Sequence, residues 1–178
     1  EVRANRDLRP ERSQGLERDW HCVGRGISAG PGLYENRYRD LIESRANLGI
    51  DPDTGALVFQ SVNRDRARIR GVEADLLWQL PVAREGDGDW QLRGALTLQY
   101  TRDALISGEQ IGLAGNGAVR GFTERAVAAD KGYYATLECY TPELAARFAH
   151  TGRLRLLGFF DLARGTFNQT PPGLYTKE

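Results

Sequence analysis

The sequence is poor in the features that mark membrane helices, metal centres and disulfide-stabilised folds. Its 178 residues include no Met, two His and two Cys, Cys22 and Cys139. No apolar run approaches the roughly 20 residues of a membrane-spanning helix. The Cys and His residues show no repeated spacing, so we expect two free thiols, no metal site and no cofactor.

The chain also lacks a charge surplus of either sign. Lys plus Arg and Asp plus Glu each number 24, so the formal net charge is zero and nothing indicates nucleic acid as a partner. Neither a nucleophile elbow nor a phosphate-binding loop is present, so we expect no catalytic residues and no enzyme activity. The first residues are charged and unlike a signal peptide, and the chain does not start with Met, which predicts a fragment or a processed piece.

The sequence does contain alternating apolar and polar residues, most clearly between positions 68 and 101. A Gly- and Asp-rich turn separates two such segments, which predicts a hairpin. Aromatic residues stand at both ends of the second apolar face, as is typical of membrane β-strands, although a soluble β-sandwich shows the same alternation. The apolar positions are Val72, Ala74, Leu76, Trp78 and Leu80, then Trp90, Leu92, Gly94, Leu96, Leu98 and Tyr100.

Two later segments, residues 133–140 and 154–162, alternate in the same way. If their apolar faces meet lipid, Glu138 and Asp161 point into the interior of a barrel. Residues 51–55 (DPDTG) between apolar runs predict an earlier hairpin turn. Residues 18–32 lack alternation and are rich in Gly, so no regular strand and little order are expected there.

These patterns predict an all-β fold, an antiparallel transmembrane β-barrel fragment that is partial or hybrid. Because the smallest membrane barrels have roughly 8 strands, and one candidate strand is irregular, we expect the chain not to close into a barrel.

The most specific motifs lie in the second half of the chain. In their order they resemble the C-terminal barrel of two-partner-secretion outer-membrane transporters, the haemolysin secretion/activation family. The resemblance implies an Arg-Gly-aromatic loop tip that folds back into the barrel lumen. The motifs are residues 107–113 (SGEQIGL), Val119-Arg120-Gly121-Phe122, Asp130-Lys131-Gly132, Glu138 and Phe159-Phe160-Asp161.

The resemblance assigns roles to particular residues. It implies that Arg120 binds Asp161 on a late strand, because a guanidinium withdrawn from water needs a carboxylate partner. Glu138 is the alternative partner on the same face. Phe122 would pack against lumen aromatics such as Phe159 or Tyr134. Without the resemblance, the motif would be an exposed Arg-Gly turn.

Residues 1–80 resemble a different family, the C-terminal barrel of TonB-dependent haem and haemoglobin receptors. The matching segments are residues 5–17, residues 34–42 (YENRYRDLI), and Asn63 followed by residues 69–73 (IRGVE). The predicted organisation is therefore receptor-like strands at 1–80, a junction at 81–89, and transporter-like strands with the lumen loop at 90–178.

The expected location is the bacterial outer membrane, with membrane lipid as one partner. The first interpretation is a barrel fragment related to exporters of haemolysin- and haemagglutinin-type proteins, with a secreted exoprotein as partner. The second is a fragment of a TonB-dependent haem or siderophore receptor, with haem or a haem protein and TonB as partners. A soluble β-rich binding domain is the third.

Overall fold

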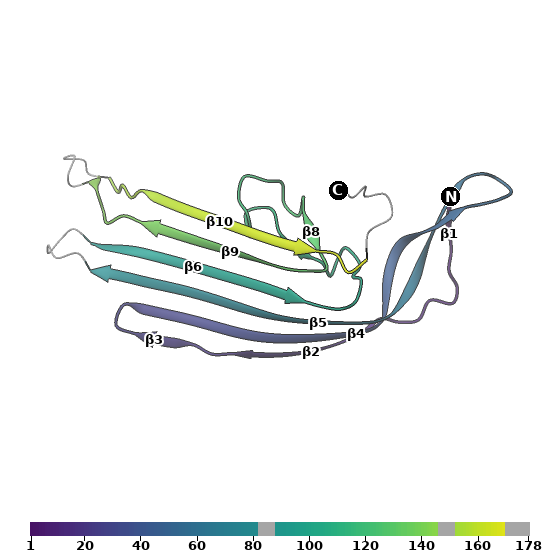
Figure 1. Cartoon of the computed structure of the whole chain (residues 1–178), viewed down its shortest axis with the longest axis horizontal. Coiled ribbons are helices and arrows are strands. Elements are labelled where there is room, and N and C mark those ends of the chain that lie inside the picture. The colour runs from purple at the N-terminus through teal and green to yellow at the C-terminus, as the bar shows by residue number, and fades with distance from the viewer. Residues whose placement is uncertain (82–87, 146–151, 170–178) are drawn as a thin grey trace.

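The computed structural model describes residues 1–81, 88–145 and 152–169, which form β-strands joined by turns and loops (Figure 1). The large sheet has the order β10-β9-β6-β5-β4-β2, with β1 also paired to β5 and β3 to β4, while β7 and β8 form a separate two-stranded sheet. The strands are β1 (Val2–Arg3), β2 (Arg12–Asp19), β3 (Cys22–Gly24), β4 (Ile27–Ile50), β5 (Leu57–Pro81), β6 (Asp89–Tyr100), β7 (Ile111–Gly112), β8 (Ala128–Ala129), β9 (Lys131–Tyr140) and β10 (Leu157–Thr166).

The predicted all-β, mostly antiparallel fold is confirmed. Every strand pair of the large sheet is antiparallel except the short pair β1–β5. Its edge strands, β10 and β2, are each paired on one side only within the described ranges, so the sheet is open as expected. Among the residues described, no helix has the length and apolar character needed to cross a membrane.

The predicted hairpin between β5 and β6 is present and regular. Its register runs without a break from Arg70 opposite Tyr100 to Pro81 opposite Asp89. Most of the predicted junction at residues 81–89 lies outside the described residues, because positions 82–87 are not described.

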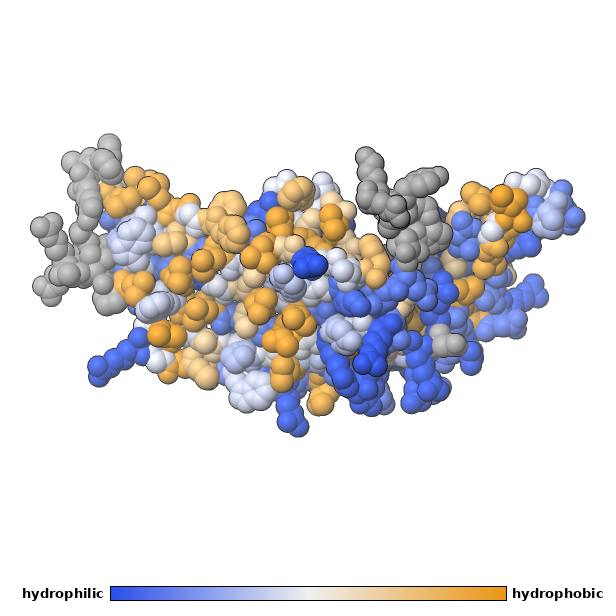
Figure 2. All heavy atoms as spheres, viewed as in Figure 1, coloured by the Kyte–Doolittle hydropathy of each residue, from blue (hydrophilic) through white to orange (hydrophobic). Residues whose placement is uncertain are grey.

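The two faces of the large sheet differ in polarity, and we call them the apolar face and the polar face. Figure 2 shows apolar side chains over the left and centre of the molecule, mostly hydrophilic ones to their right, and a separate apolar patch at the distal part of the β4–β5 hairpin. Many large residues of the apolar face are exposed, namely Leu33, Leu76, Trp78, Leu80, Trp90, Leu96, Leu98, Tyr100, Tyr133, Leu137, Phe160 and Leu162. The polar face carries Glu73, Asp75, Gln79, Gln91, Arg93, Thr97, Gln99, Thr136, Glu138 and Asp161.

The prediction that residues 18–32 lack regular strands is wrong. β2, β3 and β4 all pass through this segment with regular antiparallel pairing. Gly26 has a φ of 71° in the turn between β3 and β4, a conformation that glycine adopts without a steric penalty. Gly30 lies beside Asp75 on the polar face, where a Cβ would collide with the carboxylate. The glycines that hide the alternation therefore serve a turn and a close cross-strand contact.

β4 and β5 extend far beyond the rest of the sheet. They contain 24 and 25 residues, against 12 in β6, and Figure 1 shows their distal parts projecting at the right. The turn predicted at residues 51–55 closes this hairpin, with the carboxylate of Asp51 accepting hydrogen bonds from the backbone N–H groups of Asp53 and Thr54. One correction concerns β10, which begins at Leu157 rather than at position 154.

Candidate functional site

A long loop, residues 101–130, connects β6 to β9 and folds back over the sheet (Figure 1). Its strands β7 and β8 pair with each other. Ile111, Leu113 and Ala129 form a buried apolar cluster, against which Tyr134 of β9 and Ala163 of β10 pack. Since Tyr134 and Ala163 belong to the polar face, the loop covers that face.

The Val119–Phe122 motif stands at the tip of this loop. Val119 forms a β-bridge with Ala114, and its carbonyl accepts a 3.1 Å hydrogen bond from the Gly115 N–H. Gly121 has a φ of 90°, which a residue with a Cβ rarely adopts. These contacts fix the backbone on both sides of Arg120.

Arg120 binds two strands at once. Its Nε donates to Asp161 Oδ2 at 2.7 Å, and its Nη2 donates to Asp161 Oδ1 at 2.6 Å. Its Nη1 donates to Glu138 Oε1 at 2.6 Å. The backbone N–H of Arg120 also donates to Asp161 Oδ2, at 3.2 Å. The expected contact with Asp161 is therefore present in bidentate form, and Glu138, named as the alternative partner, binds simultaneously.

The register of β9 and β10 brings the two carboxylates together. Glu138 pairs with Phe159, and Asp161 follows two residues later on β10, so all three side chains leave the same face. The guanidinium carbon of Arg120 lies 3.9 Å from the centre of the Phe159 ring, within the range of a cation–π contact. The Tyr140 hydroxyl donates to Glu138 Oε2 at 2.8 Å, so both oxygens of the Glu138 carboxylate accept a hydrogen bond.

The site is partly withdrawn from solvent. The side chains of Arg120 and Glu138 are each 20% exposed, and that of Asp161 is 4% exposed. The hydrogen bonds to Asp161 are the main reason that the pKa of Arg120 lies above its usual value, and those to Glu138 act in the same direction. Arg120 is therefore a permanent cation between two carboxylates, an arrangement suited to holding the loop tip against the sheet.

The packing predicted for Phe122 is wrong. Its side chain is 64% exposed rather than packed against Phe159 or Tyr134. The guanidinium of Arg120 lies over the Phe159 ring instead. Gly121, between Arg120 and Phe122, has a positive φ, so these two side chains point in different directions.

Asp130 is a structural centre that the sequence analysis did not assign. It is 2% exposed and its carboxylate accepts three hydrogen bonds: from the Leu105 N–H at 3.1 Å, the Gln110 side-chain amide at 3.1 Å and the Asn168 N–H at 2.8 Å. It thereby joins both ends of the loop to the segment that follows β10. The signal in the sequence that could have indicated this role was that Asp130 belongs to the motif Asp130-Lys131-Gly132.

Two glycines permit close contacts at this place, Gly132 with the backbone of β10 and Gly165 with β8 of the loop. Gly132 pairs with Gly165 across β9 and β10, and a Cβ on Gly132 would lie 2.8 Å from the Gly165 Cα. A Cβ on Gly165 would lie 2.6 Å from the Cβ of Ala129 in β8. A larger residue at position 165 would push the loop away from the sheet, and one at position 132 would disturb the pairing of β9 with β10.

In the described ranges, no group of three or more His, Cys, Asp or Glu side chains is arranged to hold a metal ion.

The comparison with protein families matches residues 33–169 to the family described as haemolysin secretion/activation protein ShlB/FhaC/HecB. The chain belongs to this family. The match extends from β4 through β10 and includes Arg120 with both of its carboxylate partners. Membership of the ShlB/FhaC/HecB family locates the chain in the bacterial outer membrane, as expected, and the family is not one of enzymes.

The comparison with curated proteins finds no match. Among solved structures, the chain is similar to the siderophore receptor PirA from Acinetobacter baumannii, with a TM-score of 0.40 and 14% sequence identity. The similarity covers 91% of this chain and 26% of that one, so the chain spans about a quarter of the receptor's length.

Proposed function

We propose that this chain is part of the wall of an outer-membrane barrel that exports haemolysin- or haemagglutinin-type proteins, and that the Arg120 loop occupies the inner side of that wall. The observation that carries the proposal is the bidentate bond from Arg120 to Asp161 with the simultaneous bond to Glu138. The family match supports the exported class of protein.

A membrane position follows from the polarity of the two faces. Exposed Leu, Phe, Trp and Tyr side chains cover the apolar face, and contact with lipid removes them from water. On β6 this face runs from Trp90 to Tyr100. At about 3.3 Å per residue and a tilt of roughly 40°, that length spans about 25 Å, the height of the apolar band in outer-membrane barrels.

The polar face then faces the lumen, and the loop over it is the element that controls the space inside. An exported chain must pass the surface that residues 101–130 cover, so the anchor at Arg120 holds the loop in a defined position beside the path. The partners on this proposal are membrane lipid and a secreted exoprotein.

The decisive experiment is an export assay. Host cells expressing a complete barrel that contains this chain, together with a haemagglutinin-type exoprotein, should release the exoprotein into the medium, and Arg120→Ala should reduce release without reducing the amount of barrel in the outer membrane. Arg153→Ala removes an exposed arginine outside the loop and is the matched control. Absence of release with the unaltered barrel in the membrane would contradict the export function.

The division into receptor-like strands at 1–80, a junction at 81–89 and transporter-like strands at 90–178 stays a prediction. We propose that any receptor-derived part contributes wall strands only. What supports this is the continuous pairing of β4, β5 and β6 in one sheet and a family match that starts at position 33.

A further inference from the structure

We propose that the apolar face carries a binding site for the phosphate groups of an anionic glycolipid of the outer leaflet, at the point where its apolar residues give way to cations. This site rests on the proposal that the sheet spans the outer membrane. Its cations, which we call the cationic row, are Arg18, Arg70, Arg102, Lys131 and Arg164.

The cationic row lies at one end of the apolar face. Four of its members are on strands β2, β5, β9 and β10, Arg102 follows the end of β6, and β4 carries Glu35 at this level. Arg70 is two residues from Val72 on β5, and Arg164 is two residues from Leu162 on β10, so each cation takes the same face as its apolar neighbour. Lys131 stands in the same relation to Tyr133 on β9. Long cationic side chains at such positions reach the headgroup region while their stems remain in the apolar layer.

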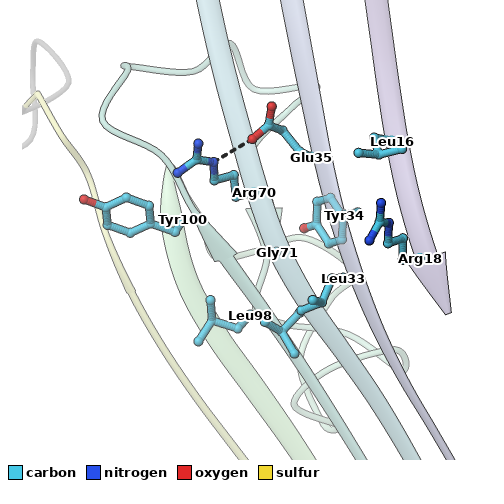
Figure 3. Close-up of a pocket in the computed structure, with 10 residues that line it drawn as sticks. Leu16, Arg18, Leu33, Tyr34, Glu35, Arg70, Gly71, Leu98 and Tyr100 are labelled. Carbon is cyan, nitrogen blue, oxygen red and sulfur yellow. Dashed lines mark hydrogen bonds and ion pairs between the residues drawn. The ribbon is translucent and has the colours of Figure 1, made fainter. Parts of the chain in front are cut away.

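A depression of about 480 Å³ in the apolar face extends from its apolar residues to the arginines of the cationic row (Figure 3). Its apolar lining comes from Leu16, Leu33, Val72 and Leu98 on four neighbouring strands. Its polar lining includes Arg18, Arg70, Tyr100 and the Glu35 carboxylate, which accepts a hydrogen bond from Arg70 at 2.7 Å. In Figure 3, Leu33 and Leu98 lie on one side of Tyr100 and Arg70. An acyl chain fits the apolar part, and a phosphate fits the arginines at its border.

The charge at this border is not balanced by acids. Glu35 alone binds three arginines, Arg37, Arg68 and Arg70. Within the part of the chain that the structure describes, no ion pair involves Arg18, Arg102, Lys131 or Arg164. The border therefore presents a net positive charge beside an apolar surface, which complements a lipid with anionic headgroups.

Within the described strands, the other end of the apolar face carries no charged side chain, and the nearby Arg25 and Arg153 lie outside the strands. Its described positions there are uncharged, namely Ile27, Ala29, Trp78, Leu80, Trp90, Leu92, Leu137, Cys139 and Gly158. Because of this asymmetry, the cationic row lies at the headgroups of only one of the two membrane leaflets. The loop of residues 101–130 and the long β4–β5 hairpin lie at the cationic end (Figure 1), and in outer-membrane barrels the longer loops are extracellular. The cationic row therefore faces the outer leaflet, where phosphorylated glycolipid is found.

The test compares two lipids that differ only in phosphate. The full chain is refolded in detergent micelles and titrated with bis-phosphorylated lipid A or with its dephosphorylated form, and bound lipid is counted by native mass spectrometry. The variant Arg18→Gln/Arg70→Gln removes the two arginines of the depression. Arg25→Gln/Arg153→Gln removes the same charge from exposed positions near the other end of the sheet.

We expect the chain to prefer the phosphorylated lipid by at least about tenfold. Each arginine contributes about fivefold in affinity for an anionic lipid surface, so the double variant should bind roughly 25-fold more weakly and the control variant within about twofold of the unaltered chain. Equal binding of the two lipids by the unaltered chain would overturn the site even if the variant failed to fold. Displacement of the lipid by equimolar inorganic phosphate would also overturn it, since the site would then bind the ion alone.

Vesicle flotation separates this proposal from the one on which it rests. A chain that floats with vesicles but shows no preference for phosphate contradicts the lipid site only. A chain that fails to float contradicts the membrane position, and the lipid site with it.

Discussion

The molecule uses arginine–carboxylate clusters on both faces of one sheet, with opposite composition. On the polar face a single arginine, Arg120, is shared by Asp161 and Glu138. At the charged end of the apolar face a single carboxylate, Glu35, is shared by three arginines that are each about half exposed or more. The first cluster joins a loop to two strands, whereas the second lies on the paired strands β4 and β5.

This difference shows that burial and connectivity decide what the same chemistry does. Arg120 is separated from its partners by 41 and 18 residues, so its bonds restrict a loop that could otherwise move away. Arg68 and Arg70 belong to a strand that the sheet already holds, so their bonds to Glu35 add little order. The polar-face cluster is thus an anchor, and the other leaves positive charge free at the surface.

The largest effect is expected from Asp130, which holds the same loop through neutral donors. Asp130→Ala should lower the free energy of unfolding by about 3 kcal/mol, because buried N–H donors lose their acceptor. Urea unfolding of the vesicle-inserted chain measures this. Asp53→Ala, in the exposed β4–β5 turn, should be close to neutral. A stability loss no larger than that of the control would show that anchoring does not depend on Asp130.

Arg120→Ala should release the loop tip. Cleavage at residues 114–122 by an added protease should become on the order of tenfold to a hundredfold faster, because the charge-assisted bonds to two strands are lost. Arg68→Ala, which removes an arginine from the Glu35 cluster, should leave the cleavage rate within about twofold. Equal rates for the two variants would remove the distinction between the clusters.

A double-mutant cycle should then sharpen the comparison. Once Arg120 is replaced by Ala, the further change Asp161→Ala should alter loop cleavage by less than about twofold, since its partner has already gone. The same cycle on Arg70 and Glu35, read by amide exchange in β4 and β5, should be nearly additive because two other arginines remain on Glu35. Additivity at Arg120 and Asp161 would contradict the anchor.

The smallest effect concerns pH at the tip of the β4–β5 hairpin. The N–H groups of Asp53 and Thr54, and secondarily Arg3, hold the pKa of Asp51 below its usual value. The carboxylate therefore stabilises the turn at pH values above the ordinary carboxyl pKa, and this contribution disappears as the pH falls through the lowered value. Amide exchange at residues 53–54 should accelerate in acid, while Asp51→Asn should abolish that dependence. An unchanged acid response in the variant would point to another group.

Much of the sheet could be predicted because alternation is a local property. The β5–β6 hairpin and the faces of β9 and β10 follow from side chains that point to opposite sides every residue. Residues 18–32 were misjudged because the reason for Gly30 is Asp75 on the neighbouring strand, which no local pattern reveals.

The amino-acid sequence by itself determined the alternating strands and the hairpin turns, because each depends on residue type and short-range geometry. The pair of Arg120 with Asp161, 41 residues apart, was expected from the resemblance of its motif to the family. Only the tertiary structure decided that Glu138 shares Arg120, that Phe122 is exposed and that Asp130 is buried among donors between 20 and 38 residues away. The physical reason is that these outcomes depend on the register of distant strands and on how the loop packs against them.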